Sequence, residues 1–365
     1  MAKHLYVAAT RQNDGKTTVA LGVIAALLER GYAVGYIKPV GQRVVKTDDG
    51  ALVDEDVLLI HGVYGLGWNL RDMSPVGIPR GFTEEYITGR TKSDLPQRIL
   101  RAFETVAQDC DVVIIEGTGH AGVGSVIDLS NATVAGMLRA AVLLVTLGGI
   151  GRPFDEVALN CSLFGSAGVE ILGVVANKVL ADKLDRISQM LGLALRRMNM
   201  ELLGAIPEVE ILSGPTVAQV LQDTGARLLS GARDLTRAAS TFVVGTSSPA
   251  LVARHFREAT LLITSGDRED LIEAALQFAQ TVHLGKGLVA VVLTDGLAPG
   301  PAILAALEQA QVPVLSVDAP CYSVANQIHD LLVKILPSDY QKIEIARSLV
   351  RRNVNIERII EKLGL

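Results

Sequence analysis

A Gly-Lys-Thr sequence near the N-terminus is the strongest chemical signal in this chain. It lies in residues 9–18, Ala-Thr-Arg-Gln-Asn-Asp-Gly-Lys-Thr-Thr, directly after the apolar run Leu5–Ala8. A loop that leads from a strand into a helix directs backbone N–H groups and the positive end of the helix dipole at one point, which favours an anion. Lys16 would then reach the β- and γ-phosphates of a nucleotide, and the hydroxyl of Thr17 would bind Mg²⁺.

The match to the phosphate-loop pattern G-x-x-x-x-G-K-[ST] is incomplete, because Thr10 stands at the position of the first glycine. An ordinary strand-to-helix turn that contains Gly-Lys-Thr is the alternative interpretation. The strand–loop–helix context favours the phosphate loop. We therefore expect ATP to be bound by the loop residues Thr10, Arg11, Asn13, Asp14, Gly15, Lys16, Thr17 and Thr18.

Acidic and basic side chains follow other apolar runs of the same half of the chain. Glu116 ends the run that begins at Asp111, Lys38 follows the run Ala33–Ile37, and Asp54 and Asp56 lie between them. Taken singly, each could be a solvated residue at the rim of a sheet. Oxygen ligands beside a phosphate loop are what Mg²⁺ requires, and a second lysine adds positive charge for phosphate. We expect Mg²⁺ to be bound by Thr17, Asp56 and Glu116, and catalysis to depend on Lys16, Lys38 and Glu116.

The elements that position these residues alternate between strands and helices. The first two hundred residues contain apolar runs typical of buried strands, separated by helical patterns such as Lys16–Glu29 and Leu95–Ala107. The runs are Leu5–Ala9, Ala33–Ile37, Val112–Ile115, Val142–Thr146 and Ile171–Ala176. Continuous apolar strands separated by helices indicate an α/β fold, with a parallel sheet that has helices on both faces.

A second, smaller α/β unit is expected after Gly214-Pro215, with a helix over Glu269–Val282. Its expected strands are Thr241–Gly245, Ala259–Thr264, Gly287–Leu293 and Val312–Val317. The last fifty residues have helical patterns, with apolar faces at Leu331–Ile335 and Ile343–Val350. The predicted domains are an ATP-binding domain over residues 1–210, a second domain over 214–320, and a helical segment over 321–365 packed on the second domain.

Charge, apolar content and cysteine spacing exclude several kinds of partner and site. The formal net charge is −5 and no dense Lys/Arg block occurs, which argues against nucleic acid. The longest apolar stretch, Ala140–Ile150, is too short to cross a bilayer, so we expect no membrane partner. The three cysteines lie far apart, which argues against a disulfide framework and a zinc site. With no secretion signal pattern at the N-terminus, we expect a cytoplasmic protein.

The motifs of the first half resemble dethiobiotin synthetases. In the order and spacing of that family stand Thr10…Gly15-Lys16-Thr17, Lys38-Pro39-Val40, Asp56 and Glu116-Gly117. That family also has threonine at the position of Thr10, which accounts for the missing glycine. The resemblance covers residues 1–210 and implies ATP and Mg²⁺ as ligands and a homodimer.

Two further segments add a site for the base. Residues 173–178, Gly-Val-Val-Ala-Asn-Lys, resemble the family's adenine-reading strand end, which implies that Asn177 contacts the base. Residues 203–208, Leu-Gly-Ala-Ile-Pro-Glu, are similar to the loop that closes over the base, which implies a contact from Pro207 and Glu208.

A closer likeness is to the dethiobiotin-synthetase-like N-terminal region of long bacterial phosphotransacetylases, through residues 73–80 and 116–120. The second half resembles the DRTGG domain of those proteins, through Gly266–Arg268 and Thr294–Gly296. Gly41-Gln42 and Thr118–His120 depart from dethiobiotin synthetases, so we do not expect a biotin enzyme. We also expect no phosphotransacetylase catalytic domain within these residues.

Some roles stay open between two interpretations. Related dimeric ATPases use a lysine at the spacing of Arg11 to reach the partner's nucleotide, so Arg11 is either a cation that acts across a dimer or an ordinary surface residue. Asp267 and Arg268 form either a ligand site or a salt-bridged turn. His120 is either a substrate contact or incidental.

Three functions are compatible with these residues. A nucleotide-responsive regulatory ATPase, with slow hydrolysis and a metabolic enzyme as partner, is the one we favour. An ATP-dependent ligase or phosphoryl transferase that acts on a small carboxylate, carbamate or phosphate metabolite is the alternative. It would need a polar acceptor pocket built from Lys38, Pro75–Arg80 and Thr118–Gly124. A fold that has lost nucleotide binding is the third.

Overall fold

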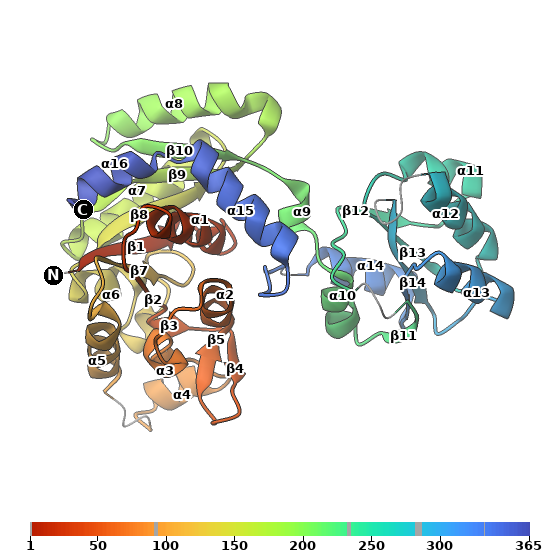
Figure 1. Cartoon of the computed structure of the whole chain (residues 1–365), viewed down its shortest axis with the longest axis horizontal. Coiled ribbons are helices and arrows are strands. Elements are labelled where there is room, and N and C mark those ends of the chain that lie inside the picture. The colour runs from red at the N-terminus through yellow and green to blue at the C-terminus, as the bar shows by residue number, and fades with distance from the viewer. Residues whose placement is uncertain (1, 91–93, 232–234, 282–286, 332) are drawn as a thin grey trace. The chain divides into compact units, whose positions relative to one another are not determined.

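The computed structural model describes residues 2–90, 94–231, 235–281, 287–331 and 333–365 (Figure 1). The described chain divides into two compact units. The first contains the residues up to Glu208 together with Tyr340–Leu365, and the second contains Val209–Asp339. The long middle segment is thus inserted into the first unit.

A six-stranded parallel sheet forms the centre of the first unit, with strand order β10-β9-β8-β1-β7-β2. Its strands are β1 (Lys3–Ala9), β2 (Val34–Ile37), β7 (Val112–Glu116), β8 (Ala141–Leu147), β9 (Ile171–Val179) and β10 (Leu202–Pro207). β2 and β7 are buried along their whole length, as expected for Val- and Ile-rich strands of a sheet that is covered on both faces. All five strands predicted for this half are confirmed within three residues at their ends, the largest difference being at the end of β9.

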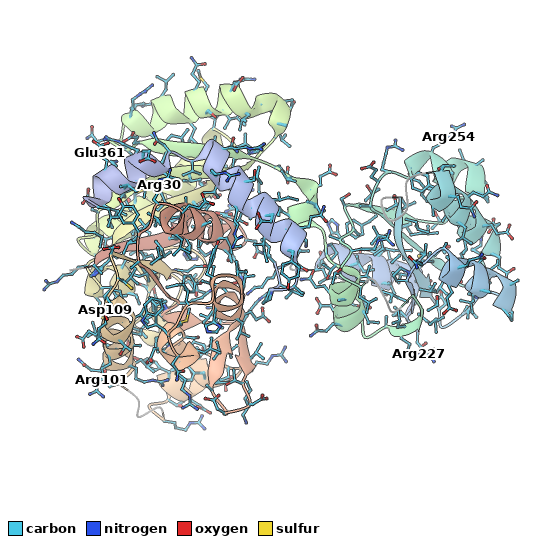
Figure 2. The ribbon with its side chains drawn as sticks, in the orientation of Figure 1. Arg30, Arg101, Asp109, Arg227, Arg254 and Glu361 are labelled. Atoms are coloured by element: carbon cyan, nitrogen blue, oxygen red, sulfur yellow. The ribbon has the colours of Figure 1, made fainter. Side chains whose placement is uncertain are left out.

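Helices cover the sheet, and a small excursion separates β2 from β7. The covering helices are α1 (Lys16–Leu28), α5 (Leu95–Ala107), α6 (Asn131–Met137), α7 (Gly151–Ser166), α8 (Leu184–Arg196), α15 (Tyr340–Asn353) and α16 (Ile356–Leu363). The excursion consists of β3 (Val40–Gly41), β4 (Val44–Lys46), β5 (Leu52–Asp54), α2 (Glu55–Tyr64), α3 (Leu70–Met73), β6 (Val76–Gly77) and α4 (Phe82–Ile87). Charged side chains such as Arg101 and Asp109 point outward from this unit (Figure 2).

The segment from Leu202 to Pro207 corrects one prediction. Residues 203–208 were expected to form a loop over a base, whereas residues 202–207 form the edge strand β10, parallel to β9. Leu203 and Ile206 are buried in the sheet, which outweighs the weak strand preference of Gly204 and Pro207.

The second unit has a five-stranded sheet with order β11-β15-β14-β13-β12, in which only the pairing of β11 with β15 is antiparallel. Its strands are β11 (Arg227–Ser230), β12 (Thr241–Val244), β13 (Thr260–Ser265), β14 (Leu288–Thr294) and β15 (Val314–Ser316). Its helices are α9 (Glu210–Ser213), α10 (Val217–Thr224), α11 (Pro249–Val252), α12 (Glu269–Thr281), α13 (Pro301–Gln309) and α14 (Cys321–His329). The four predicted strands and the helix from Glu269 are confirmed; Val282, the predicted end of that helix, lies outside the described residues.

The C-terminal helices pack differently from the prediction. α14 belongs to the second unit, but α15 and α16 belong to the first, so the expectation that residues 321–365 pack together on the second domain is wrong. α15 packs on α1, where Gly22 leaves space for Val350. Leu331 and residues 333–335, also expected to be helical, lie outside any helix. In the part of the chain that the structure describes, no helix is long and apolar enough to cross a membrane.

Candidate functional site

The loop between β1 and α1 is shaped by left-handed backbone conformations. Asn13 has φ of 67° and Gly15 has φ of 96°, and α1 begins at the next residue, Lys16. A Cβ atom at position 15 would lie 2.0 Å from Nδ2 of Asn177, so only glycine fits there. The loop thereby brings its backbone to the N-terminus of α1, where the helix dipole favours phosphate.

Asp14 closes this loop from the inside. One of its carboxylate oxygens, Oδ2, accepts hydrogen bonds of 2.7 Å from the Thr10 hydroxyl and 2.7 Å from the Arg11 N–H. Burial raises the pKa of Asp14 to about 6, although the bond from Thr10 favours the ionised form. We predicted Asp14 to be a nucleotide contact; the structure places its side chain within the loop, where it fixes the loop's shape.

Lys16 and Thr17 occupy the first turn of α1 and face the end of β7. The Thr17 hydroxyl donates a 2.7 Å hydrogen bond to Oε1 of Glu116. Lys16 is buried, and burial lowers its pKa, while the charge of Glu116 opposes this shift. A buried ammonium whose pKa is lowered by loss of water contact is suited to an incoming phosphate.

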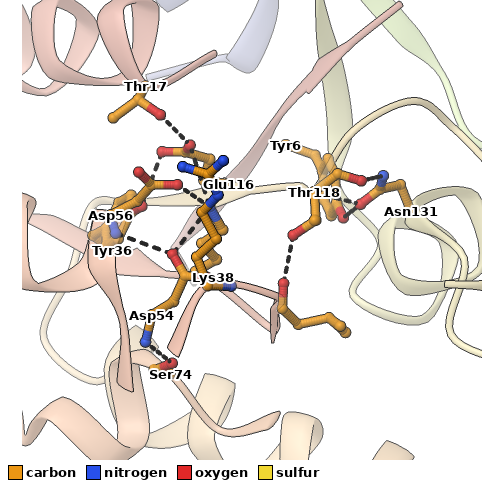
Figure 3. A network of polar contacts seen from close by, with 12 residues as sticks. Tyr6, Thr17, Tyr36, Lys38, Asp54, Asp56, Ser74, Glu116, Thr118 and Asn131 are labelled. Atoms are coloured by element: carbon orange, nitrogen blue, oxygen red, sulfur yellow. Dashed lines mark hydrogen bonds and ion pairs between the residues drawn. The ribbon is translucent and has the colours of Figure 1, made fainter. Parts of the chain in front are cut away.

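Three carboxylates surround Lys38 at the end of β2 (Figure 3). Its Nζ contacts Asp56 directly and lies 3.2 Å from Oδ1 of Asp54 and 3.7 Å from Oε1 of Glu116. The Tyr36 hydroxyl donates a 2.9 Å hydrogen bond to Oε2 of Glu116. All of these side chains are buried, although they come from separate segments of the chain. The parallel sheet and the excursion after β2 bring them to one edge.

The electrostatics of this cluster favour an added cation. Burial alone would lower the pKa of Lys38, but the charges of Asp56, Glu116 and Asp54 outweigh it and raise the pKa. Burial raises the pKa of Glu116, and Lys38 only partly opposes this. Three carboxylates share one ammonium within 4 Å. Ionised, the three carboxylates would exceed Lys38 by two negative charges, and the charge of Lys16, which also acts on Glu116 and Asp56, offsets one of them; the remaining negative charge favours a cation.

The residues present fit Mg²⁺ in the way that nucleotide sites hold it. Within the described ranges, no group of three or more His, Cys, Asp or Glu side chains is arranged to hold a metal ion by itself. Mg²⁺ commonly takes one or two protein carboxylates and fills its remaining positions with phosphate oxygens and water. Thr17 and Glu116, already joined by a hydrogen bond, could supply such ligands. Asp56, the third expected ligand, contacts Lys38 here.

A second polar network fixes the loop after Glu116. The side chain of Asn131 accepts hydrogen bonds from the Tyr6 hydroxyl (2.8 Å) and the Thr118 N–H (3.0 Å), and donates to the carbonyls of Thr118 and His120, both at 2.6 Å. The Thr118 hydroxyl donates to the carbonyl of Val40, just after Lys38 (Figure 3). The loops that follow β7 and β2 are therefore joined.

Sequence analysis missed Asn131, Tyr36 and Tyr6. Their positions carry no local motif, because their partners are far away in the chain. The predicted His120 lies in the fixed loop, and its Nδ1 accepts a hydrogen bond from the Gly122 N–H at 3.1 Å.

The residues expected near the base reach the same edge of the sheet. Asn177 is buried and donates a 2.8 Å hydrogen bond to the carbonyl of Asp14. Pro207 ends β10, and the N–H of the exposed Glu208 donates to the carbonyl of Val179. Asn177 is thus brought to the phosphate loop. The structure places Pro207 and Glu208 beside the end of β9.

Arg11 is held within its own chain. Its guanidinium contacts Glu156 of α7, which also pairs with Arg152 at 2.9 Å. Thr18 lies half-buried in the first turn of α1.

In the second unit, Arg268 pairs with Asp270 at 2.9 Å and donates to the carbonyl of Ser247 at 2.9 Å. Arg268 therefore forms an ion pair with the first turn of α12, and the choice between a ligand site and a salt-bridged turn at Asp267 and Arg268 stays a prediction.

Two family models match the chain. Residues 3–216 match the model described as AAA domain, and residues 219–331 match the model described as DRTGG domain. Among curated proteins, the phosphate acetyltransferases of Nitrosomonas europaea and Pseudomonas putida are 25% and 27% identical over 98% of this chain. The chain spans about half the length of these relatives, 51% and 52% respectively.

Two solved structures are similar to parts of this chain, at low identity and low TM-score. A chain of the MinC:MinD cell division protein complex of Aquifex aeolicus is 14% identical, with a TM-score of 0.37, over 58% of this chain and 84% of that one. The septum site-determining protein MinD of Pyrococcus horikoshii, complexed with Mg-ADP, is 19% identical with a TM-score of 0.37 over the same shares.

Proposed function

Because this chain belongs to the AAA domain family, here joined to a DRTGG domain, we propose that it binds Mg-ATP at the β1–α1 loop and acts as a nucleotide-responsive regulatory ATPase. The observation that carries the proposal is the convergence of Lys16, Thr17 and Glu116 at one buried edge of the sheet. Loop N–H groups and Lys16 would hold the phosphates, and Thr17 and Glu116 would hold Mg²⁺. The metal would supply charge neutralisation at the phosphates.

The regulatory role is supported by how the chain is connected. The segment that contains the DRTGG match is inserted between β10, which ends beside Asn177's strand, and α15, which packs on α1. Both connections therefore leave from elements next to the proposed ATP site. A ligand that orders this site could bias the inserted segment or a bound partner, provided that it binds one state more tightly than the other. Phosphate acetyltransferase activity of the relatives suggests a metabolic enzyme as that partner.

Phosphoryl transfer to a small carboxylate, carbamate or phosphate metabolite is the second candidate. The observation in its favour is the rigid attachment of Thr118 to both Asn131 and Val40, beside Lys38. A fixed polar loop next to a second buried lysine is what an acceptor site needs, because positioning supplies most of the rate in such reactions. Lys16 and Lys38 would stabilise the charge on the transferred group, and Glu116 would orient the metal.

Calorimetric titration with Mg-ATP tests the proposal, with Lys16→Ala as the control and phosphate release followed in the same samples. Saturable binding that Lys16→Ala abolishes, with slow hydrolysis, is the expected result. Turnover stimulated by carboxylate metabolites would favour the second candidate. If the wild-type protein does not bind at millimolar Mg-ATP, the site does not function as a nucleotide site.

A further inference from the structure

Two consecutive residues at the end of β9 donate to two consecutive carbonyls of the phosphate loop. Nδ2 of Asn177 lies 2.8 Å from the carbonyl oxygen of Asp14, and Nζ of Lys178 lies 3.1 Å from that of Asn13. Neighbouring side chains on a regular strand point to opposite faces of the sheet. That both reach one loop therefore requires a local departure from strand geometry.

A bulge in β9 provides this departure. Ala176 pairs with Ala205 and Val179 with Pro207, so two residues of β9 oppose the single residue Ile206 of β10. Lys178 has φ of 54°, a left-handed conformation that few residues other than glycine adopt. Bulges commonly redirect a side chain beside a functional site. Here the bulge turns the Lys178 side chain toward the same loop as Asn177.

Holding these carbonyls fixes the direction of the loop's N–H groups. In a trans peptide, the carbonyl of one residue and the N–H of the next point in opposite directions. The hydrogen bonds to the carbonyls of Asn13 and Asp14 therefore turn the N–H groups of Asp14 and Gly15 away from Asn177 and Lys178. An anion-binding loop needs its N–H groups directed at the ligand before the ligand arrives.

We propose that Asn177 and Lys178 are positioning residues for the phosphate site, and that they set the loop for any polyphosphate chain, with or without a base. This inference rests on the proposed function, since it concerns how the same loop binds phosphate. It assigns Asn177 a role that the expected contact with adenine does not include. Lys178 had no expected role.

Paired titrations of Mg-ATP and Mg-tripolyphosphate, which has no base, test this inference on the full chain. Lys178→Met keeps the apolar stem and removes the donor, and Asn177→Asp replaces the donor nitrogen by oxygen. Lys183→Met, at an exposed lysine of the following turn, is the matched control. We expect Lys178→Met to weaken both ligands by the same factor, roughly tenfold, because one charge-assisted hydrogen bond is lost. Lys178→Arg should restore part of the affinity.

Hydrogen exchange of residues 11–18 in the ligand-free protein tests whether Lys178 holds the loop in place or only attracts the phosphate by its charge. Lys178→Met should speed exchange in this loop while the global melting temperature changes little. Loss for Mg-ATP alone would overturn the inference in favour of a base contact. Equal loss without faster exchange would overturn it in favour of attraction through space, and no loss of affinity would also overturn it. If the wild-type protein binds neither ligand, the proposed function fails, but the exchange comparison still tests whether the two residues hold the loop.

Discussion

Lys38 is the ammonium on which three buried carboxylates depend. It contacts Asp56 and lies within 4 Å of Asp54 and Glu116, and none of these groups has appreciable contact with water. Removing one partner of a buried ion pair costs about 3–5 kcal/mol, because the charge left behind has neither water nor a counterion. The stability of the first unit should therefore depend on this one side chain.

Lys38→Met is expected to lower the free energy of unfolding by about 3–5 kcal/mol at pH 7.5. Without the ammonium, the pKa of Glu116, which burial already raises, should rise further above its value in the unfolded state. The loss should therefore shrink as the pH falls toward 5 and Glu116 takes up a proton. Urea denaturation at both pH values measures this, with the exposed Lys46→Met as control. An equal loss at both pH values would contradict the electrostatic explanation.

At Asp14, in contrast to Lys38, removal of the charge is expected to increase the stability of the protein. Its pKa is raised to about 6 in the folded protein, above the ordinary value of 3.8, so its charge opposes folding at neutral pH. The contribution of Asp14 to the free energy of unfolding is therefore greatest below about pH 4, where its carboxyl is protonated. This contribution is lost as the pH rises through 6 and the carboxyl ionises. Asp14→Asn should thus stabilise the protein at pH 7.5, by on the order of 1–3 kcal/mol.

Differential scanning fluorimetry across pH 4.5–8 measures this effect. The gain in melting temperature for Asp14→Asn should fall toward zero at the acidic end, because the wild-type carboxyl is then neutral as well. Asp182→Asn removes a carboxylate at an exposed position and should give no such trend. If Asp14→Asn is less stable than the wild type at pH 7.5, the two hydrogen bonds to the carboxylate outweigh the cost of burying its charge.

At the scale of elements, α15 packs on the helix that begins at the phosphate loop. Gly22 of α1 lies so close to Val350 that an added Cβ would be 2.2 Å from the Cβ of Val350. Arg347 stacks over the ring of Tyr64, 4.8 Å from its centroid, and the Tyr64 hydroxyl donates to the carbonyl of Leu21. The glycine is therefore required by the packing of two helices.

Two glycines inside helices should respond oppositely to alanine. Gly22→Ala is expected to cost about 1–3 kcal/mol or more, because α15 must move away from α1. In α8, an added Cβ at Gly192 would meet nothing closer than 4.0 Å, so Gly192→Ala should stabilise by about 0.5–1 kcal/mol through helix propensity. Chemical denaturation of the two variants makes the comparison. A stabilising Gly22→Ala would contradict the close packing of α1 and α15.

The local sequence pattern predicted the helices and strands better than it predicted which elements pack against one another. Apolar runs such as Val112–Ile115 predicted the buried strands, because the covered parallel sheet needs a continuous apolar sequence. The run Ile343–Val350 predicted a helix with an apolar face, but periodicity does not say which surface covers that face. β10 escaped prediction because Gly204 and Pro207 weaken its strand pattern.

In the candidate site, too, residues within local motifs could be predicted, whereas residues that depend on distant partners could not. Lys16, Thr17 and Glu116 were predictable because each belongs to a motif at the end of an element. Asn131 and Tyr36 were not, because their partners lie far away in the sequence and only the fold brings them together. Lys178 belongs to the motif at residues 173–178, yet its contact with the loop depends on a bulge in β9 that no local pattern indicates.

At the scale of the whole molecule, the first unit is built from two separate parts of the chain. After the second unit, α15 covers α1, and α16 contacts β1, β9 and β10. The Asn355 N–H donates to the carbonyl of Leu203, and Val354 pairs with Gly204, so the C-terminal residues also protect the exposed edge strand. Among the inserted residues that the structure describes, none supplies a side chain assigned to the proposed ATP site.

Replacing residues 209–339 by a flexible Gly/Ser linker of about 15 residues should therefore leave a folded protein that binds Mg-ATP within about threefold of the full chain. Deleting residues 340–365 instead should lower the melting temperature by roughly 10 °C or more, because α1 and the edge of β10 lose their cover. Fluorimetry and calorimetry on both variants measure these outcomes. If the linker variant folds but no longer binds Mg-ATP, the inserted segment completes the site, and the regulatory proposal would have to give way to one in which both units bind the nucleotide.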